Sequence, residues 1–183
     1  GGGGFDEANA IAVDSSGSAY VVGATASSNF PVTYGAAQSI FAGGYDAFAA
    51  KLSPAGDALT YATLIGGSAS ETALGIALDA SGNTGIGGFT NSIDFPVRQP
   101  LQSTSGGQFD AFAAVLDSSG YMLLFSTYLG GVGDDRAFAV AAAPGNRIYL
   151  AGVTQSSILP NTTAGDSVPG TSDAFIATIT YDN

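Results

Sequence analysis

The residues of this sequence that could do chemistry are almost all acidic. The chain has no cysteine and no histidine, and its 183 residues include 15 Asp and Glu against 4 Lys and Arg. Without thiol and imidazole groups, a cysteine nucleophile, a Ser-His-Asp triad and a His-ligated zinc site are excluded. Carboxylate chemistry and the binding of cations through oxygen ligands are left.

Three acids, Glu7, Glu71 and Asp135, precede similar stretches of sequence and are aligned as equivalent positions. If they surround one end of a central channel, they could form a ring of carboxylates that binds Ca²⁺, which prefers several oxygen ligands. In the simpler interpretation they are solvated turn acids that accept backbone hydrogen bonds. We therefore expect no cofactor and no catalytic residue, with Ca²⁺ as the alternative at these three positions.

A second set of acids opens the triplet Asp-Ala-Phe at Asp46, Asp110 and Asp173. A catalytic residue is expected once in a chain, whereas an acid present in every copy of a repeated segment indicates a shared structural task. We expect these carboxylates to accept backbone N–H groups where a strand begins.

Aromatic residues are the second group of candidate binding residues. Tyr34, Phe41, Tyr45 and Phe109 lie on or near long connections, where exposed rings could stack on sugars or peptide side chains and buried rings would anchor the loops. The phenylalanines of the repeated triplets are expected in the core.

The charge balance limits the partners. Four basic residues are too few for a surface that follows nucleic-acid phosphates or binds anionic membranes. No apolar run approaches the ~18 residues of a transmembrane helix, so membrane insertion is not expected. A protein, a glycan or another copy of the chain is the expected partner.

These residues belong to a unit that recurs about every 64 residues. Each unit contains four candidate strands, at 10–13, 19–23, 46–52 and 59–65 in the first copy. Turns of the type Asp-x-Ser-Gly separate them, because Asp bonds the backbone two residues on and Gly accepts the left-handed conformation. Residues 135–143 are rich in alanine, but their alignment with earlier first strands predicts a strand rather than a helix.

Four antiparallel strands repeated radially are the plan of a β-propeller blade. The sequence therefore predicts an all-β fold, a single partial propeller of about three four-stranded blades at 6–67, 70–131 and 134–183. The third blade lacks its last strand, and the ring is incomplete. The remaining blades are expected from a longer chain or from another copy of this one.

The segments AIAVDSSGSAYVVGAT (10–25), NFP (29–31), GGYDAFAAKLSPAG (43–56) and LIGG (64–67) resemble the bacterial SBBP-type β-propeller repeat. This resemblance implies a secreted or cell-surface protein and a scaffold without shared catalytic residues. The expected function is a non-catalytic structural or interaction module. The alternatives are a fragment of a carboxylate-dependent carbohydrate-active enzyme and a subunit that assembles into rings or filaments by completing its blades with neighbouring chains.

Overall fold

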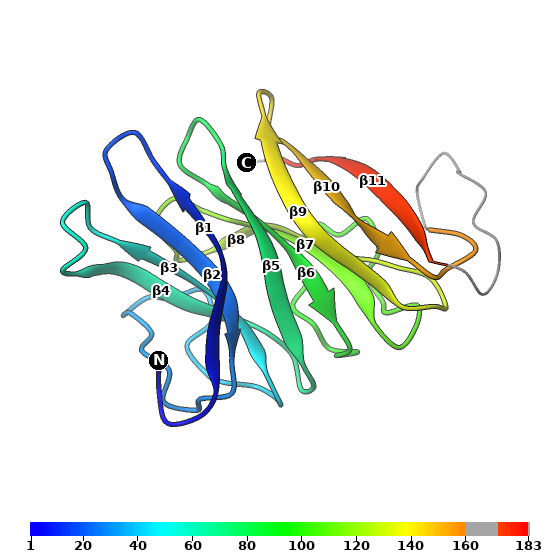
Figure 1. The fold of residues 1–183 in the computed structure, drawn as a ribbon, viewed down its shortest axis with the longest axis horizontal. Coiled ribbons are helices and arrows are strands. Elements are labelled where there is room, and N and C mark those ends of the chain that lie inside the picture. The colour runs from blue at the N-terminus through cyan, green and yellow to red at the C-terminus, as the bar shows by residue number, and fades with distance from the viewer. Residues whose placement is uncertain (160–171, 183) are drawn as a thin grey trace.

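The computed structural model describes residues 1–159 and 172–182, and it is built from antiparallel β-sheets (Figure 1). Within these residues there is no helix with the length and apolar character needed to cross a membrane. The described strands are β1 Asp6–Val13, β2 Ala19–Thr25, β3 Asp46–Leu52, β4 Leu59–Ile65, β5 Glu71–Leu78, β6 Thr84–Thr90, β7 Asp110–Leu116, β8 Leu123–Leu129, β9 Asp135–Ala143, β10 Arg147–Thr154 and β11 Asp173–Thr180.

The described strands form three sheets in which neighbours in sequence are neighbours in space. The first sheet has the order β1-β2-β3-β4, the second β5-β6-β7-β8, and the third β9-β10-β11. The second sheet lies between the other two in Figure 1. Strand β5 packs against β1, β2 and β3, and β9 packs against β5, β6 and β7. The prediction of an incomplete all-β propeller with a three-stranded last sheet is confirmed.

The predicted strands agree closely with the observed ones. The third and fourth strands of the first unit have the predicted bounds, and residues 135–143 form a strand as expected. The first strand begins earlier, at Asp6, because residues 6–8 continue the pairing with β2 up to Thr25. Residues 160–171 and 183 of the predicted third blade lie outside the described residues.

The hairpin turns have the expected chemistry. Asp14 Oδ1 accepts the backbone N–H groups of Ser16 at 2.9 Å and Ser18 at 3.0 Å. Gly17 adopts the left-handed conformation with φ of 87°, as do the equivalent glycines at 82 and 120. These turns fix where each strand reverses, and so fix which side chains share a face.

The hydrophobic core lies between the sheets. Side chains of the first sheet, including Tyr20, Val22 and Tyr61, pack on Ile86 and Phe112 of the second. The other side of the second sheet packs in the same way on the third, with Val115 and Phe125 of the second sheet against residues of β10 and β11. Each contact between two sheets is called a seam below.

Candidate binding face

One face of every sheet carries a glycine on its second strand paired with a phenylalanine on its third. The pairs are Gly23–Phe48, Gly88–Phe112 and Gly152–Phe175. We call this side of each sheet its front face and the opposite side its back face. In both seams, the front face of the later sheet packs on the back face of the sheet before it.

The front faces of the first two sheets are built alike. Phe30 packs on Phe48 with ring centroids 4.7 Å apart and planes at 34°, and Phe95 packs on Phe112 at 4.8 Å and 35°. The residue pairs beside the phenylalanines are also similar, Val21 with Ala50 and then Ile86 with Ala114. The first front face therefore has the same design as a surface that is covered in the second sheet.

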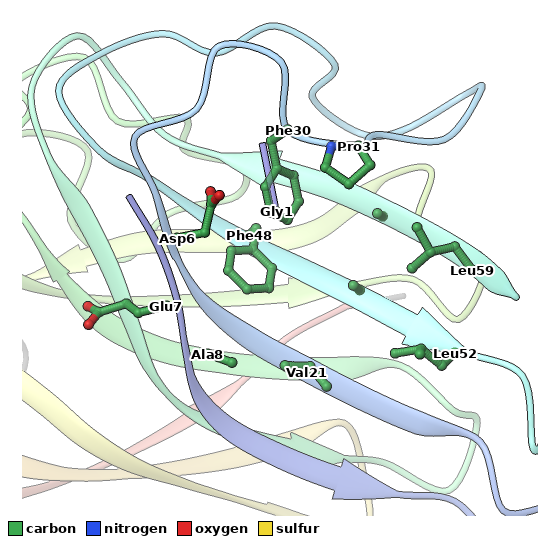
Figure 2. Close-up of a pocket in the computed structure, with 12 residues that line it drawn as sticks. Gly1, Asp6, Glu7, Ala8, Val21, Phe30, Pro31, Phe48, Leu52 and Leu59 are labelled. Atoms are coloured by element: carbon green, nitrogen blue, oxygen red, sulfur yellow. The ribbon is translucent and has the colours of Figure 1, made fainter. Parts of the chain in front are cut away.

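The two faces differ in burial on the innermost strand, whereas Phe48 and Ala50 at the centre of the first face are buried. Ala73 and Ala137 on the innermost strands of the later sheets are fully buried, whereas the corresponding Ala8 is exposed. A hollow of about 340 Å³ opens here, and its exposed lining is mainly apolar. Figure 2 shows the side chains around it, with acidic groups only at one end. The lining residues are Gly1, Asp6, Glu7, Ala8, Val21, Phe30, Pro31, Phe48, Ala50, Leu52, Leu59 and Ala62.

The acid at the start of each first strand is part of a repeated hydrogen-bonded cluster. Glu71 accepts from the Thr90 hydroxyl and from the backbone N–H of Gly67. Asp135 accepts in the same way from Thr154, from Ser156 at 2.7 Å and from the N–H of Gly131. These acids tie the chain that enters each sheet to the end of the second strand.

In the first sheet this position is held by Asp6, and the alignment that placed Glu7 there is wrong by one residue. Asp6 pairs with Thr25 and accepts from its hydroxyl, from Ser27 Oγ at 3.0 Å and from the N–H of Gly2 at 2.7 Å. Partial burial raises the pKa of Asp6, but these hydrogen bonds outweigh the burial, and the net effect is a lowered pKa. Glu7 lies one residue further on, at the end of the hollow (Figure 2).

The acids suggested as a carboxylate ring for Ca²⁺ do not form one cluster in the described part of the chain. Glu71 and Asp135 each satisfy hydroxyl and backbone donors of their own sheet, as described above. Within residues 1–159 and 172–182, no group of three or more Asp, Glu, His or Cys side chains is placed to hold a metal ion.

Asp46 and Asp110, at the start of the third strands of the first two sheets, accept backbone N–H groups as expected, whereas for Asp173 this stays a prediction. Asp46 Oδ2 accepts from Ala42 N at 3.1 Å, and Asp110 Oδ2 accepts from Gly106 N at 2.6 Å. The sequence did not indicate that the second oxygen of each of these buried carboxyls has no hydrogen-bond partner.

The unpartnered oxygen of Asp46 faces an acid of the next sheet. Asp46 Oδ1 and Glu71 Oε2 each lie 2.7 Å from the point where a Cβ on Gly66 would stand. Burial, and then the charge of Glu71, raises the pKa of Asp46 to about 6. Burial also raises the pKa of Glu71. In the second seam, burial and the nearby Asp135 raise the pKa of Asp110. Each seam thus contains a buried pair of acids.

The loop aromatics have different environments. Tyr34 is almost completely exposed, and Tyr45 is partly exposed and packs edge-on against Phe5 at 6.3 Å. Phe41 packs against the cluster that contains Phe48. Phe109 packs against Phe89 and lies under the guanidinium of Arg136, 5.1 Å away. Tyr34 alone of the four candidates therefore offers a largely free ring, and the other three make these loop contacts.

A known protein family matches part of the chain. No curated protein matches the chain. Residues 1–31 match the SBBP family, which is described as a β-propeller repeat. The matched segment contains β1, β2 and Phe30-Pro31, and the pairing of its two strands recurs in the second and third sheets. Residues 1–31 are thus similar to the SBBP β-propeller repeat in sequence, within a chain whose described sheets are arranged as propeller blades.

Proposed function

We propose that the chain is a non-catalytic structural and interaction module on a β-propeller scaffold, acting outside the cell or on its surface. Its binding surface is the front face of the first sheet, and its partner is another blade-type sheet. The location is supported by the resemblance to SBBP repeats. The interaction is supported by one observation: this face repeats the design of the two front faces that are covered inside the chain, and it is open.

A carbohydrate-active enzyme is less well supported. The carboxyls with raised pKa values, Asp46, Glu71 and Asp110, have no exposed surface. A general acid must reach the group that it protonates, and these carboxyls offer a substrate no contact surface.

The test measures whether the folded protein binds at this face. Nile red, a neutral dye whose fluorescence rises in apolar surroundings, is titrated into dilute protein. We expect saturable binding that is weakened at least about five-fold by Ala8→Asp or Leu59→Asp, since both side chains line the hollow. The matched control is Ile93→Asp, because Ile93 is 84% exposed and lies on a loop outside the hollow.

Binding that does not change in either front-face variant would contradict the assignment of this face. A specific polysaccharide turnover that is lost on Glu71→Gln in a protein that still folds would instead favour the enzyme. Cell fractionation of the source organism tests the location separately.

A further inference from the structure

A second hollow, of about 300 Å³, opens beside the first seam and shares no lining residue with the hollow on the front face. Its lining residues are Ala37 from the connection between β2 and β3, Val97 and Arg98 from the connection between β6 and β7, and Tyr121, Met122 and Leu123 from the β7–β8 turn and the start of β8. Ala37 and Leu123 also pack against the core cluster of the first seam. The hollow is therefore built by the first and second units together.

The backbone around Arg98 is fixed and carries local strain. Arg98 N donates to Ser126 O at 3.0 Å, and Ser126 N donates to Arg98 O at 2.9 Å, so both backbone groups of Arg98 are tied to β8. The next residue, Gln99, adopts the left-handed conformation with φ of 49°. This conformation is strained for a residue with a side chain, and strained residues are concentrated at binding and catalytic sites. The segment thus combines a fixed arginine with a backbone arrangement typical of such sites.

The β7–β8 turn is held just as firmly. Asp117 Oδ1 accepts the backbone N–H groups of Tyr121 and Met122, each at 2.8 Å. Ala37 N donates to Gly120 O at 3.1 Å, which joins the turn to the first unit. The residues of the turn that line the hollow therefore have a defined backbone position before any ligand arrives.

Three lining residues differ from their counterparts in the first unit. Thr33 N donates to β4 and Arg98 N donates to β8, each at 3.0 Å, so these two residues correspond. Ala58 O accepts a backbone N–H at 2.9 Å across the β3–β4 turn, as Met122 O does across the β7–β8 turn. The three changes from the first unit to the second are Thr33 to Arg98, Asp57 to Tyr121 and Ala58 to Met122. A structural task shared by both units would keep these residues alike, so their joint change around one hollow indicates a task that the first unit does not have.

The side chain of Arg98 is available to a ligand. It is exposed, and it makes no ion pair or hydrogen bond with any residue in 1–159 or 172–182. The other three basic residues each have a polar partner within 4 Å, and the pairs are Lys51 with Asp14, Arg136 with Asp134 and Arg147 with Tyr149. A guanidinium group presents a planar fork of N–H donors that fits the two oxygens of a carboxylate.

The rest of the lining is apolar or aromatic. Val97 is 38% exposed, Met122 43% and Tyr121 57%, so all three present surface to a ligand. Apart from Arg98 and the Tyr121 hydroxyl, no lining side chain could bond the hydroxyl groups of a sugar. A volume of about 300 Å³ lies at the small end of the range for ligand sites. The lining therefore fits a short ligand that is acidic at one end and apolar along its body.

We propose that this hollow binds a small ligand in which a carboxylate is attached to an apolar body. Arg98 holds the carboxylate, and Tyr121, Met122 and Val97 pack against the apolar part. This chemistry occurs in free apolar acids and at the C-terminus of a peptide whose last side chain is apolar. The site goes beyond the proposed function, because it lies outside the front face of the first sheet. It is also independent of what precedes the first sheet or follows the third, since all its lining residues lie between β2 and the start of β8.

The test uses Met122 as a reporter, because it is the only methionine of the sequence and lines the hollow. Protein labelled with ¹³C in the methionine methyl group is titrated with 4-phenylbutyrate at pH 7 and followed by NMR. Met122→Ala identifies the reporter signal by its loss. The uncharged amide, 4-phenylbutyramide, is the comparison ligand. We expect a saturable shift with the acid and binding of the amide that is at least about ten-fold weaker.

The key variant is Arg98→Thr, which introduces the residue that the first unit carries. It should weaken binding of 4-phenylbutyrate at least about ten-fold and leave binding of the amide unchanged. The matched control is Arg147→Thr, which removes another exposed arginine and should not alter either affinity. Near-UV circular dichroism checks that both variants are folded.

The outcomes decide both the site and the source of its ligand. The absence of a saturable shift at millimolar 4-phenylbutyrate overturns the proposal, and so does equal binding of the acid and the amide or an Arg98→Thr variant that binds the acid as the wild type does. A second titration uses acetyl-alanyl-phenylalanine with a free C-terminus. Tighter binding of this peptide than of 4-phenylbutyrate supports a peptide end as the ligand, and the reverse order supports a free acid.

Discussion

The buried acid pair in the first seam leads to a specific prediction for Asp46→Asn. Asp46 Oδ2 keeps its role as an acceptor if the amide oxygen of asparagine takes its place towards Ala42 N. The amide nitrogen then replaces Oδ1, the oxygen without a hydrogen-bond partner, and faces Glu71 with a donor instead of a second acceptor. The substitution keeps the shape of the side chain and removes one buried titratable group.

The size of the expected change in the free energy of unfolding follows from the pKa of Asp46. The pKa of Asp46 rises from an ordinary 3.8 to about 6 on folding, first through burial and then through the charge of Glu71. Because the folded protein binds this proton more tightly, the contribution of Asp46 is complete below about pH 4 and is lost as the pH rises through about 6. The wild type is thereby destabilised by up to about 3 kcal/mol at pH 7 relative to pH 4. The asparagine side chain of the variant does not titrate, so the variant avoids this loss.

The assay is urea unfolding of the wild type and of Asp46→Asn at pH 4, 5, 6 and 7.5. The free energy of unfolding of the variant minus that of the wild type should increase across this range by about 2–3 kcal/mol. Any constant effect of the substitution on packing cancels in this comparison. Asp57→Asn, on an exposed turn, is the control. A difference between Asp46→Asn and wild type that is the same at pH 4 and pH 7.5 would refute the account of the acid pair.

Three further predictions test the packing by thermal or urea unfolding. Gly120→Ala should destabilise the protein by at least about 2 kcal/mol, because a Cβ there would stand 2.4 Å from the Tyr61 ring. Gly56 has a similar positive φ but open space around it, so Gly56→Ala should cost only about 1 kcal/mol. Equal costs of the two substitutions would contradict the contact with Tyr61. Tyr61→Phe should cost about 1–3 kcal/mol by leaving a buried threonine hydroxyl of β6 unpaired, and a neutral result would mean that water replaces the bond. Phe112→Ala should cost about 3–5 kcal/mol. Phe48→Ala should cost less, because Phe48, although buried, borders the hollow and water can fill the space that its ring leaves; a reversed order would contradict this.

The strands and their order could be predicted from the sequence because the repeated segments align and most turns share one chemistry. Hydrogen bonding by Asp14 and the left-handed Gly17 recur at Asp79 and Gly82 in the second unit, whereas Ala143 takes the place of the aspartate in the third. The start of the first strand was harder to place. Asp6 and Glu7 are adjacent acids, and the choice between them shifts the register by one residue and moves the side chain to the opposite face.

A signal for the correct choice was present in the sequence. The acid, the threonine and the serine of each cluster are separated by constant intervals, since Asp135 bonds to Thr154 and Ser156, which are 19 and 21 residues away. The same intervals lead from Asp6 to Thr25 and Ser27. An alignment based on these three side chains selects Asp6, whereas the run of four glycines at 1–4 is compatible with either acid.

The open face and the acid pairs could not be found in the same way. Ala8, Ala73 and Ala137 are the same residue in similar contexts, and their burial differs only because a sheet covers two of them. The contact between Asp46 and Glu71 joins two repeats through space, and neither residue's local sequence indicates it. Both features depend on how the sheets stack.

The use of two different faces at every seam also bears on how such a chain can evolve. The front face of each later sheet fits the back face of the sheet before it. Duplication of a gene segment that encodes about 64 residues therefore adds a blade together with a surface that already fits its neighbour. The chain can thus lengthen without the invention of a new interface. Later substitutions are then constrained in pairs that lie on adjacent repeats, so compensating changes should connect positions such as Tyr61 with Thr84 more strongly than positions within one sheet.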